Sequence, residues 1–321
     1  MKLWQARVAL LIIAALWGYG YIATADAIQN VSVMQMQIVR FGLSVVLLCI
    51  FFWKRLQKIT KRTWLFGIIL GLVFYSGMTI HSTALETTTV SKNAFLVVFF
   101  LAIVPVLMYV FFKVKIKLYF VFGIITMLLG FFILVFDINL LDLAGSLASI
   151  RGEANLVLGD YLTLLSAVFF AVHIVIIGYF VTKEDPVNLV TIQLGVACLL
   201  SLISCLFNGE PIPFINLNYD ILIPVLPSIL FLGIAACFTF GGQIYVQKFL
   251  PASNTALIFS TESMFAAAFS VMLGKEPLTS GLIVGAIVIT LGIVWAETGF
   301  KFKEETDVEK EIHVITDQYV E

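Results

Sequence analysis

A single carboxylate lies in the middle of an apolar segment near the end of the chain. Residues 257–269 read LIFSTESMFAAAF, and mostly apolar residues extend on both sides of Glu262. A charged side chain at the centre of a membrane helix costs about 2.5 to 3.5 kcal/mol on insertion scales, so it faces a cavity, finds a partner or carries a proton. We therefore expect Glu262 to bind substrate or accept a proton inside a cavity. A structural carboxylate, hydrogen-bonded to a neighbouring helix, is the alternative.

One cation also lies well inside an apolar segment. Arg40 is about two turns from one end of residues 33–53, a depth from which its side chain can still reach the interface. A guanidinium at the rim of a cavity can bind a carboxylate or a phosphate. A tie between helices, to Asp26 or to backbone carbonyl groups, explains the residue equally well.

Three further polar residues extend the candidate site. His81 and His173 are lone histidines that can titrate between about pH 5 and 8, although hydrogen-bonded packing is the commoner role for such residues. Gln243 shares one helical face with Ala236 and Phe240, and we expect this face to look inward because polar side chains avoid lipid.

Aromatic residues suit the lining of a cavity for flat or apolar solutes. The better candidates lie within apolar segments near glycine or polar residues, and they are Trp17, Tyr19, Tyr21, Tyr75 and Tyr245. Asn93 begins another apolar segment, where it either lines a vestibule or caps a helix. The sequence contains no nucleophile with its base, no paired catalytic carboxylates, no metal-ligand spacing, no phosphate-binding loop and no nucleic-acid patch. We therefore predict neither an enzyme nor a metal or cofactor site.

The elements that position these residues follow from the composition. With 61% hydrophobic and 12% charged residues in 321, the chain is too apolar for a water-soluble domain. Ten apolar segments are long enough for membrane spans, which need about 20 residues. They are unbroken apolar runs, which favours helices over the alternating strands of a barrel. The ten segments are 6–25, 33–53, 64–85, 90–112, 118–136, 157–181, 187–207, 221–247, 253–274 and 281–299.

The distribution of lysine and arginine predicts the orientation in the membrane. Residues 54–62 hold five cations and residues 113–117 hold three, whereas the alternate gaps hold single cations. Because cytoplasmic loops are rich in lysine and arginine, we expect both termini in the cytoplasm. The charged tail at 300–321 is expected to extend from the last span on that side.

Weak internal similarity predicts two halves. A shift of 162 positions places Gly71 on Gly233 and Gly130 on Gly292, and a shift of 153 places Arg40 on Gln193. Each half has five spans, an odd number, so the second half must be inverted in the membrane. We predict a first repeat at 1–138, an extracytoplasmic connecting loop at 139–156, a second repeat at 157–299 and the tail, with a central cavity between the repeats.

Several motifs resemble the EamA family of the drug/metabolite transporter superfamily. They are ALWGYGYIA, IVRFGLS, TTTVSKNAF and ASNTALIFSTESMFAAAFSVMLGKEPLT, and the resemblance covers the chain except its tail. It implies secondary transport of amino acids, other metabolites or drugs rather than ATP hydrolysis. It also implies a glutamate at the position of Glu262, whatever the substrate. Proline commonly follows that glutamate in the family, whereas Ser263 follows it here, so a proline-dependent break of this helix is not indicated.

These observations together predict a secondary transporter of the cell membrane. It moves a small organic metabolite by alternating access, as an exporter that exchanges or co-transports protons, and it works as a monomer or a dimer in the lipid bilayer. A multidrug efflux carrier is the first alternative. A channel, a structural or sensory membrane protein, and a membrane enzyme acting on lipids are more remote ones.

Overall fold

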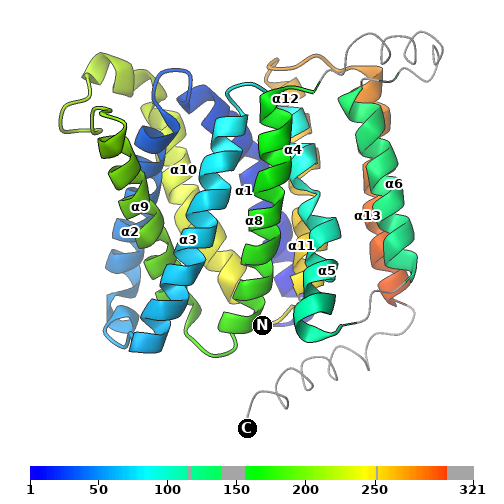
Figure 1. Ribbon diagram of the computed structural model, residues 1–321, viewed down its shortest axis with the longest axis horizontal. Helices are drawn as coiled ribbons and strands as arrows, with labels where there is room; N and C mark the ends of the chain where they lie inside the picture. The colour runs from blue at the N-terminus through cyan, green and yellow to red at the C-terminus, as the bar shows by residue number, and fades with distance from the viewer. Residues whose placement is uncertain (115–117, 137, 139–155, 251, 302–321) are drawn as a thin grey trace.

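The computed structural model describes residues 1–114, 118–136, 138, 156–250 and 252–301, and all regular secondary structure in these ranges is helical. The prediction of an all-α membrane protein is confirmed. The expected connecting loop at 139–156 and the tail at 300–321 lie, apart from 156, 300 and 301, outside the described residues. Figure 1 shows the helices, which are α1 (Leu3–Ala27), α2 (Val33–Leu56), α3 (Lys61–Ala84), α4 (Val90–Val97), α5 (Phe100–Phe112), α6 (Leu118–Val135), α8 (Leu158–Phe180), α9 (Pro186–Phe207), α10 (Tyr219–Val246), α11 (Ala252–Phe259), α12 (Glu262–Met272) and α13 (Ser280–Lys301).

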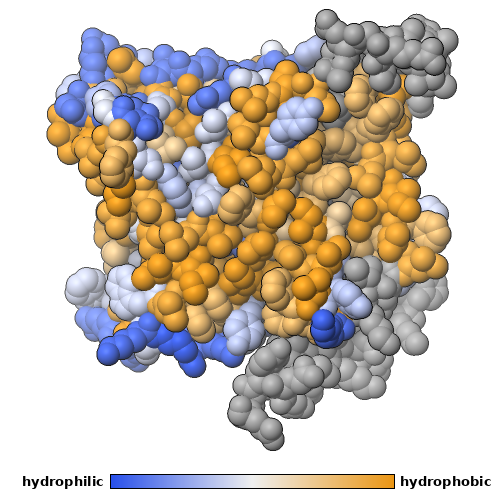
Figure 2. Space-filling view, in the orientation of Figure 1, coloured by the Kyte–Doolittle hydropathy of each residue, from blue (hydrophilic) through white to orange (hydrophobic). Residues whose placement is uncertain are grey.

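Helices occur at all ten positions expected for membrane spans. Within the described ranges, seven stretches are long and apolar enough to cross a membrane: α1, α2, α3, α4 together with α5, α8, α9 and α10. The other three positions hold α6, the α11–α12 pair and α13. On the face shown in Figure 2, apolar side chains cover the middle and polar side chains gather at both ends. A bilayer requires this distribution of the protein surface.

Side chains that cap the first turns explain where several helices begin. Ser32 accepts a hydrogen bond from the backbone N–H of Gln35 at 3.1 Å, and the Gln35 side chain accepts one from the backbone of Ser32 at 2.9 Å. This reciprocal pair is a capping box. The Asp185 side chain caps α9 by accepting hydrogen bonds from the backbone N–H groups of Val187 and Asn188, and Pro186 is at the first helical position.

The expected span at 253–274 is not one helix, because it breaks between α11 and α12. The Thr261 N–H donates to the Ile258 carbonyl three residues back, at 3.2 Å. The hydroxyls of Thr261 and Ser263 donate to the carbonyls of Ile258 and Ser260, at 2.7 and 2.8 Å. Such side-chain bonds compete with the regular helical ladder. The break therefore forms without a proline and leaves Glu262 as the first residue of α12.

The expected span at 90–112 is broken in a similar way, between α4 and α5. The Leu101 N–H donates to the Val98 carbonyl at 2.8 Å, and the Ala102 N–H donates to the Phe99 carbonyl at 3.0 Å, so the chain tightens to three-residue spacing there. Pro105 lies beyond the break, and α5 continues through it.

The helix pair α6 and α13 lies at one side of the bundle (Figure 1). These two helices pack chiefly on each other, and small residues let their backbones touch. A Cβ atom added at Gly130 would lie 2.6 Å from the backbone nitrogen of Ile289. One added at Gly285 would lie 2.8 Å from the carbonyl oxygen of Gly130. No larger residue fits at either position without separating the helices.

The remaining helices cross the bundle in alternating directions, so their links gather at two ends (Figure 1). One end carries the N-terminus and the link between α2 and α3. We call it the basic end, after Lys54, Arg55, Lys58, Lys61 and Arg62. The opposite end carries Asp26, Asp160, Glu210 and Glu276.

Candidate functional site

A pocket of about 80 Å³ lies among helices from both parts of the chain. Its walls come from α1, α2, α3 and α5, and from α8, α10, α11 and α12. Seven of the eleven residues that the sequence singled out line this pocket, although their individual roles stay predictions. The seven are Trp17, Tyr21, Arg40, His81, His173, Gln243 and Glu262.

Glu262 lies at the start of α12 and is only 6% exposed. The Tyr21 hydroxyl of α1 donates a hydrogen bond to its Oε1 atom at 3.1 Å. Its place in the first turn is favourable for a negative charge, because the partial positive charge at the N-terminus of a helix attracts anions. The break before α12 thus gives this carboxylate a polar setting inside an apolar bundle.

A glycine permits the contact between Tyr21 and Glu262. A Cβ atom added at Gly18 of α1 would lie 2.5 Å from the Cβ atom of Phe265 and 2.9 Å from the backbone nitrogen of Ala266, both in α12. The two backbones are therefore as close as they can be next to the pocket. A side chain at Gly18 would push α12, and Glu262 with it, away from α1.

Arg40 of α2 also lines the pocket, and its side chain is 6% exposed. Within the described ranges its guanidinium forms no ion pair, and its Nε atom has no hydrogen-bond partner. The guanidinium carbon lies 5.6 Å from the ring centre of Phe41 and 5.9 Å from that of Phe240. Asp26 was one of the two partners that the sequence suggested for a tie between Arg40 and another helix. This ion pair does not form, and Asp26 pairs with Lys275 at 2.7 Å instead.

The two histidines have different surroundings. His81 packs edge-on against Tyr21, with ring centres 5.0 Å apart, and its Nε2 atom has no hydrogen-bond partner among the described residues. The Nε2 atom of His173 is 3.0 Å from the side-chain oxygen of Gln193. His173 therefore ties α8 to α9, whereas the buried Nε2 atom of His81 makes no such contact among the described residues.

Aromatic side chains form one wall of the pocket. The ring of Trp17 lies 5.5 Å from that of Phe240 and 4.5 Å from that of Phe259, and Phe74 meets Phe240 edge-on at 4.6 Å. Of this group the sequence analysis proposed Trp17 as a cavity-lining aromatic residue and placed Phe240 on the inward face of Gln243, whereas it named neither Phe74 nor Phe259. Thr239, which is fully buried and has an unpartnered hydroxyl among the described residues, was missed as well. Its position four residues before Gln243, on the same helical face, was the available signal.

Tyr245 and Asn93 do not line the pocket. Tyr245 is 44% exposed because it lies two residues from Gln243 and so faces another side of α10. Asn93 is fully buried, and its side-chain nitrogen donates to the Thr163 hydroxyl at 2.8 Å, which ties α4 to α8. The other two aromatic candidates also lie elsewhere: Tyr19 meets Phe231, and Tyr75 bonds Ser204.

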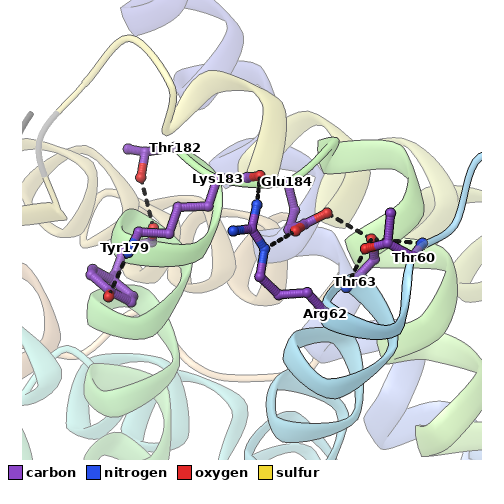
Figure 3. Close-up of polar contacts among 7 residues, drawn as sticks. All are labelled: Thr60, Arg62, Thr63, Tyr179, Thr182, Lys183 and Glu184. Atoms are coloured by element: carbon purple, nitrogen blue, oxygen red, sulfur yellow. Dashed lines mark hydrogen bonds and ion pairs between the residues drawn. The ribbon is translucent and has the colours of Figure 1, made fainter. Parts of the chain in front are cut away.

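Polar contacts tie the bundle together at its basic end (Figure 3). Arg62 of α3 binds the Glu184 carboxylate and donates to the Lys183 carbonyl at 2.9 Å, and the Thr63 hydroxyl donates to Glu184 at 2.6 Å. Lys183 in turn bonds the Tyr179 hydroxyl at 2.6 Å. Partial burial raises the pKa of Glu184, but the hydrogen bonds from Thr63 and Arg62 outweigh it and hold this pKa below its usual value.

A second set of contacts ties the opposite end. Lys275 pairs with Asp26, and Glu276 accepts hydrogen bonds from the backbone and the hydroxyl of Ser91. Buried Asp160 accepts a hydrogen bond from the Thr88 hydroxyl. Contacts between segments distant in sequence thus tie the helices together at both ends of the bundle.

Comparison with known proteins gives one family. The sequence profile of the EamA-like transporter family matches twice, at residues 5–136 and 157–298. An uncharacterized transporter of Archaeoglobus fulgidus is 24% identical over 294 residues, which are 92% of this chain and 86% of that protein. A solved structure, titled only as the crystal structure of a protein, aligns with 94% of this chain and 100% of its own at a TM-score of 0.69. At 15% identity that likeness shows the fold alone.

Proposed function

The chain belongs to the EamA-like transporter family, a family of multi-pass membrane transporters rather than enzymes, and from this premise we propose that its pocket binds a small organic metabolite during transport. The metabolite crosses the cell membrane by alternating access, in the direction of export. Both termini lie in the cytoplasm in this proposal, because the basic end carries most of the lysine and arginine of the links.

An inverted repeat is part of the proposal. The family profile matches once in each half, and the shift of 162 positions places α4 (Val90–Val97) on α11 (Ala252–Phe259), including the break that follows each. The first helices of the two halves, α1 and α8, run in opposite directions (Figure 1). These observations support two oppositely oriented halves, at 1–138 and 157–299, with the substrate site between them.

The observation that carries the function is the contact between Tyr21 and Glu262. It joins the first helix of one half to a broken helix of the other, inside the pocket. A cationic group of the substrate, or a proton, that binds Glu262 competes with the Tyr21 hydroxyl. A ligand shifts a conformational equilibrium by its difference in affinity for the two states. Occupancy of Glu262 can therefore change which end of the bundle is open.

Counterflow in proteoliposomes tests this proposal. A metabolite library is first screened for compounds that raise the melting temperature of the purified protein, because a ligand selective for the folded state stabilises it. The hits are then labelled and their exchange is measured for the wild type and for Glu262→Gln. We expect saturable exchange by the wild type and loss of it in the variant, which should remain folded and inserted. Normal exchange by Glu262→Gln would exclude the proposed role of this residue.

A further inference from the structure

We propose that Arg40 determines the specificity of the pocket by binding a carboxylate group of the transported molecule. This inference rests on the proposed function, since it assigns the substrate class of the same pocket. The substrate is then a small organic acid whose carboxylate meets the guanidinium and whose body lies against the aromatic wall.

The first argument is that Arg40 is a buried cation without a counter-ion. Its side chain is 6% exposed, and the ion pairs found in the described part of the chain do not include it. Asp26, which the sequence analysis named as a possible partner of Arg40, forms an ion pair with Lys275. A buried charge is strongly unfavourable unless it is paired and hydrogen-bonded. An anion that enters from outside the chain would therefore stabilise the buried charge of Arg40 and accept hydrogen bonds from its N–H groups.

Glu262 does not supply that anion. Among the described residues its side chain accepts a hydrogen bond from the Tyr21 hydroxyl, and the ring of Tyr21 packs against His81. Among the described residues, no ion pair joins Glu262 to Arg40 although both line one pocket. The pocket thus presents one cation and one carboxylate at separate places.

A purely structural role explains Arg40 less well. The rings of Phe41 and Phe240 attract its guanidinium, but contacts of this kind are weak compared with the penalty of burying a charge. At the position that the shift of 153 pairs with Arg40, the second half has Gln193, which bonds His173 and carries no charge. The corresponding place in the second half is therefore filled without a cation.

The chemistry of the pocket favours a carboxylate over a phosphate. A guanidinium offers two parallel N–H groups that match the two oxygens of a carboxylate. Arg40 is the one lysine or arginine among the lining residues that the structure describes, so it neutralises a monoanion but leaves a dianion uncompensated. The ring of Phe240 lies 5.9 Å from the guanidinium carbon, and the rings of Trp17 and Phe74 pack on Phe240 in the same pocket wall, which suits an apolar body.

Matched pairs of carboxylic acids and their primary amides test the assignment. The pairs cover aliphatic and aromatic skeletons, and the binding of each compound is measured from the melting temperature of the purified full-length protein. We expect acids to stabilise the wild type more than their amides. Arg40→Gln should weaken the binding of the best acid by about 10-fold to 100-fold, as expected for loss of hydrogen bonds to a charged group. Arg7→Gln, which removes an exposed arginine of α1, is the control and should bind like the wild type.

Three results would overturn the assignment: amides that bind as well as their acids, acids that bind Arg40→Gln as tightly as the wild type, or a panel in which no acid binds. If Arg40→Gln fails to fold, Arg40→Lys replaces it, because lysine keeps the charge but lacks the two parallel N–H groups. The same loss of acid binding is then expected, to a smaller degree, and unchanged binding counts against the proposal.

Counterflow of the best acid separates this inference from the proposed function. If the wild type carries the acid and Arg40→Gln carries it equally well, the transporter stands and the role of Arg40 falls. If the acid binds through Arg40 but the wild type does not carry it, Arg40 is a carboxylate-binding residue of the pocket, and the claim that such acids are the transported molecules falls.

Discussion

A Cβ atom at Gly18 would lie 2.5 Å from the Cβ atom of Phe265, which is far shorter than an ordinary contact of 3.4 to 4 Å. The second close atom is the backbone nitrogen of Ala266, at 2.9 Å. Neither atom is the flexible end of a side chain, so the substitution Gly18→Ala has to move the α12 backbone. The movement needed to restore an ordinary contact is about 1 Å.

The magnitude follows from a comparison with Gly195, where an added Cβ atom meets nothing within 4 Å. Replacing a helical glycine by alanine stabilises a helix by about 0.5 to 1 kcal/mol when there is space. This gain is common to both variants and cancels between them. The remaining difference is the overpacking at Gly18, which is about 1 to 3 kcal/mol. We expect Gly18→Ala to unfold more easily than Gly195→Ala by that amount.

The assay is reversible unfolding in mixed micelles, followed by circular dichroism, together with counterflow of an identified substrate. A shift of about 1 Å would stretch the 3.1 Å contact between Tyr21 and Glu262 beyond hydrogen-bonding range. Gly18→Ala should therefore also lose substrate exchange, whereas Gly195→Ala should keep it. Equal unfolding free energies for the two variants, with exchange intact in both, would refute the reasoning.

Three further predictions concern named contacts. In a double-mutant cycle, Tyr21→Phe and Glu262→Gln should show a coupling energy of about 0.6 to 1.7 kcal/mol in unfolding experiments, the range for polar contacts within membranes, and a value near zero would exclude the contact. Because the pKa of Glu184 is lowered in the folded protein, its contribution to stability is present above the usual value of 4.5 and is lost as the pH falls through the lowered pKa. Acidification from about pH 6 to pH 3 should lower the melting temperature of the wild type more than that of Glu184→Gln, and parallel curves would contradict this. Asn93→Ala should reduce the free energy of unfolding by about 1 to 3 kcal/mol, because the buried Thr163 hydroxyl loses the hydrogen bond that the Asn93 side chain donates to it. Substrate affinity should stay unchanged. A loss of affinity at normal stability would show instead that Asn93 takes part in substrate binding.

The sequence predicted the positions of the spans because an unbroken apolar run of sufficient length has few alternatives in a bilayer. Seven of the candidate residues chosen from the sequence line one pocket in the structure, because polar side chains within apolar helices avoid lipid and face the interior. Glu262 is the clearest case, because placing a charged carboxylate in hydrocarbon costs so much free energy that its side chain is expected to face the protein interior.

The helix breaks were not predicted. The break before Glu262 depends on hydroxyl groups that bond to carbonyls of the preceding turn, and Ser or Thr does this in some helices and not in others. Tyr245 was misplaced for a simpler reason. Proximity to polar residues in sequence does not fix which face of a helix a side chain occupies, and the face shared by Ala236, Phe240 and Gln243 excludes it.

The partner of Asp26 depended on tertiary structure. Arg40 and Lys275 are both cations that a sequence can offer to this carboxylate, and only the arrangement of α1 beside α12 selects Lys275. The same selection leaves Arg40 without a partner among the described residues. Because Asp26 pairs with Lys275 and not with Arg40, the guanidinium of Arg40 remains, within the described part of the chain, as an unpaired cation in the pocket.

The glycine contacts between α6 and α13 have a mechanical consequence. Two backbones that touch at Gly130 and Gly285 leave no free space between the helices at these points, so we expect α6 and α13 to move together rather than separately. In the chain, α6 follows α5 and α13 follows α12, and α5 and α12 are the segments that begin just after the two breaks. A movement of either segment would therefore act on the same helix pair, and we expect this pair to couple the movements of the two segments.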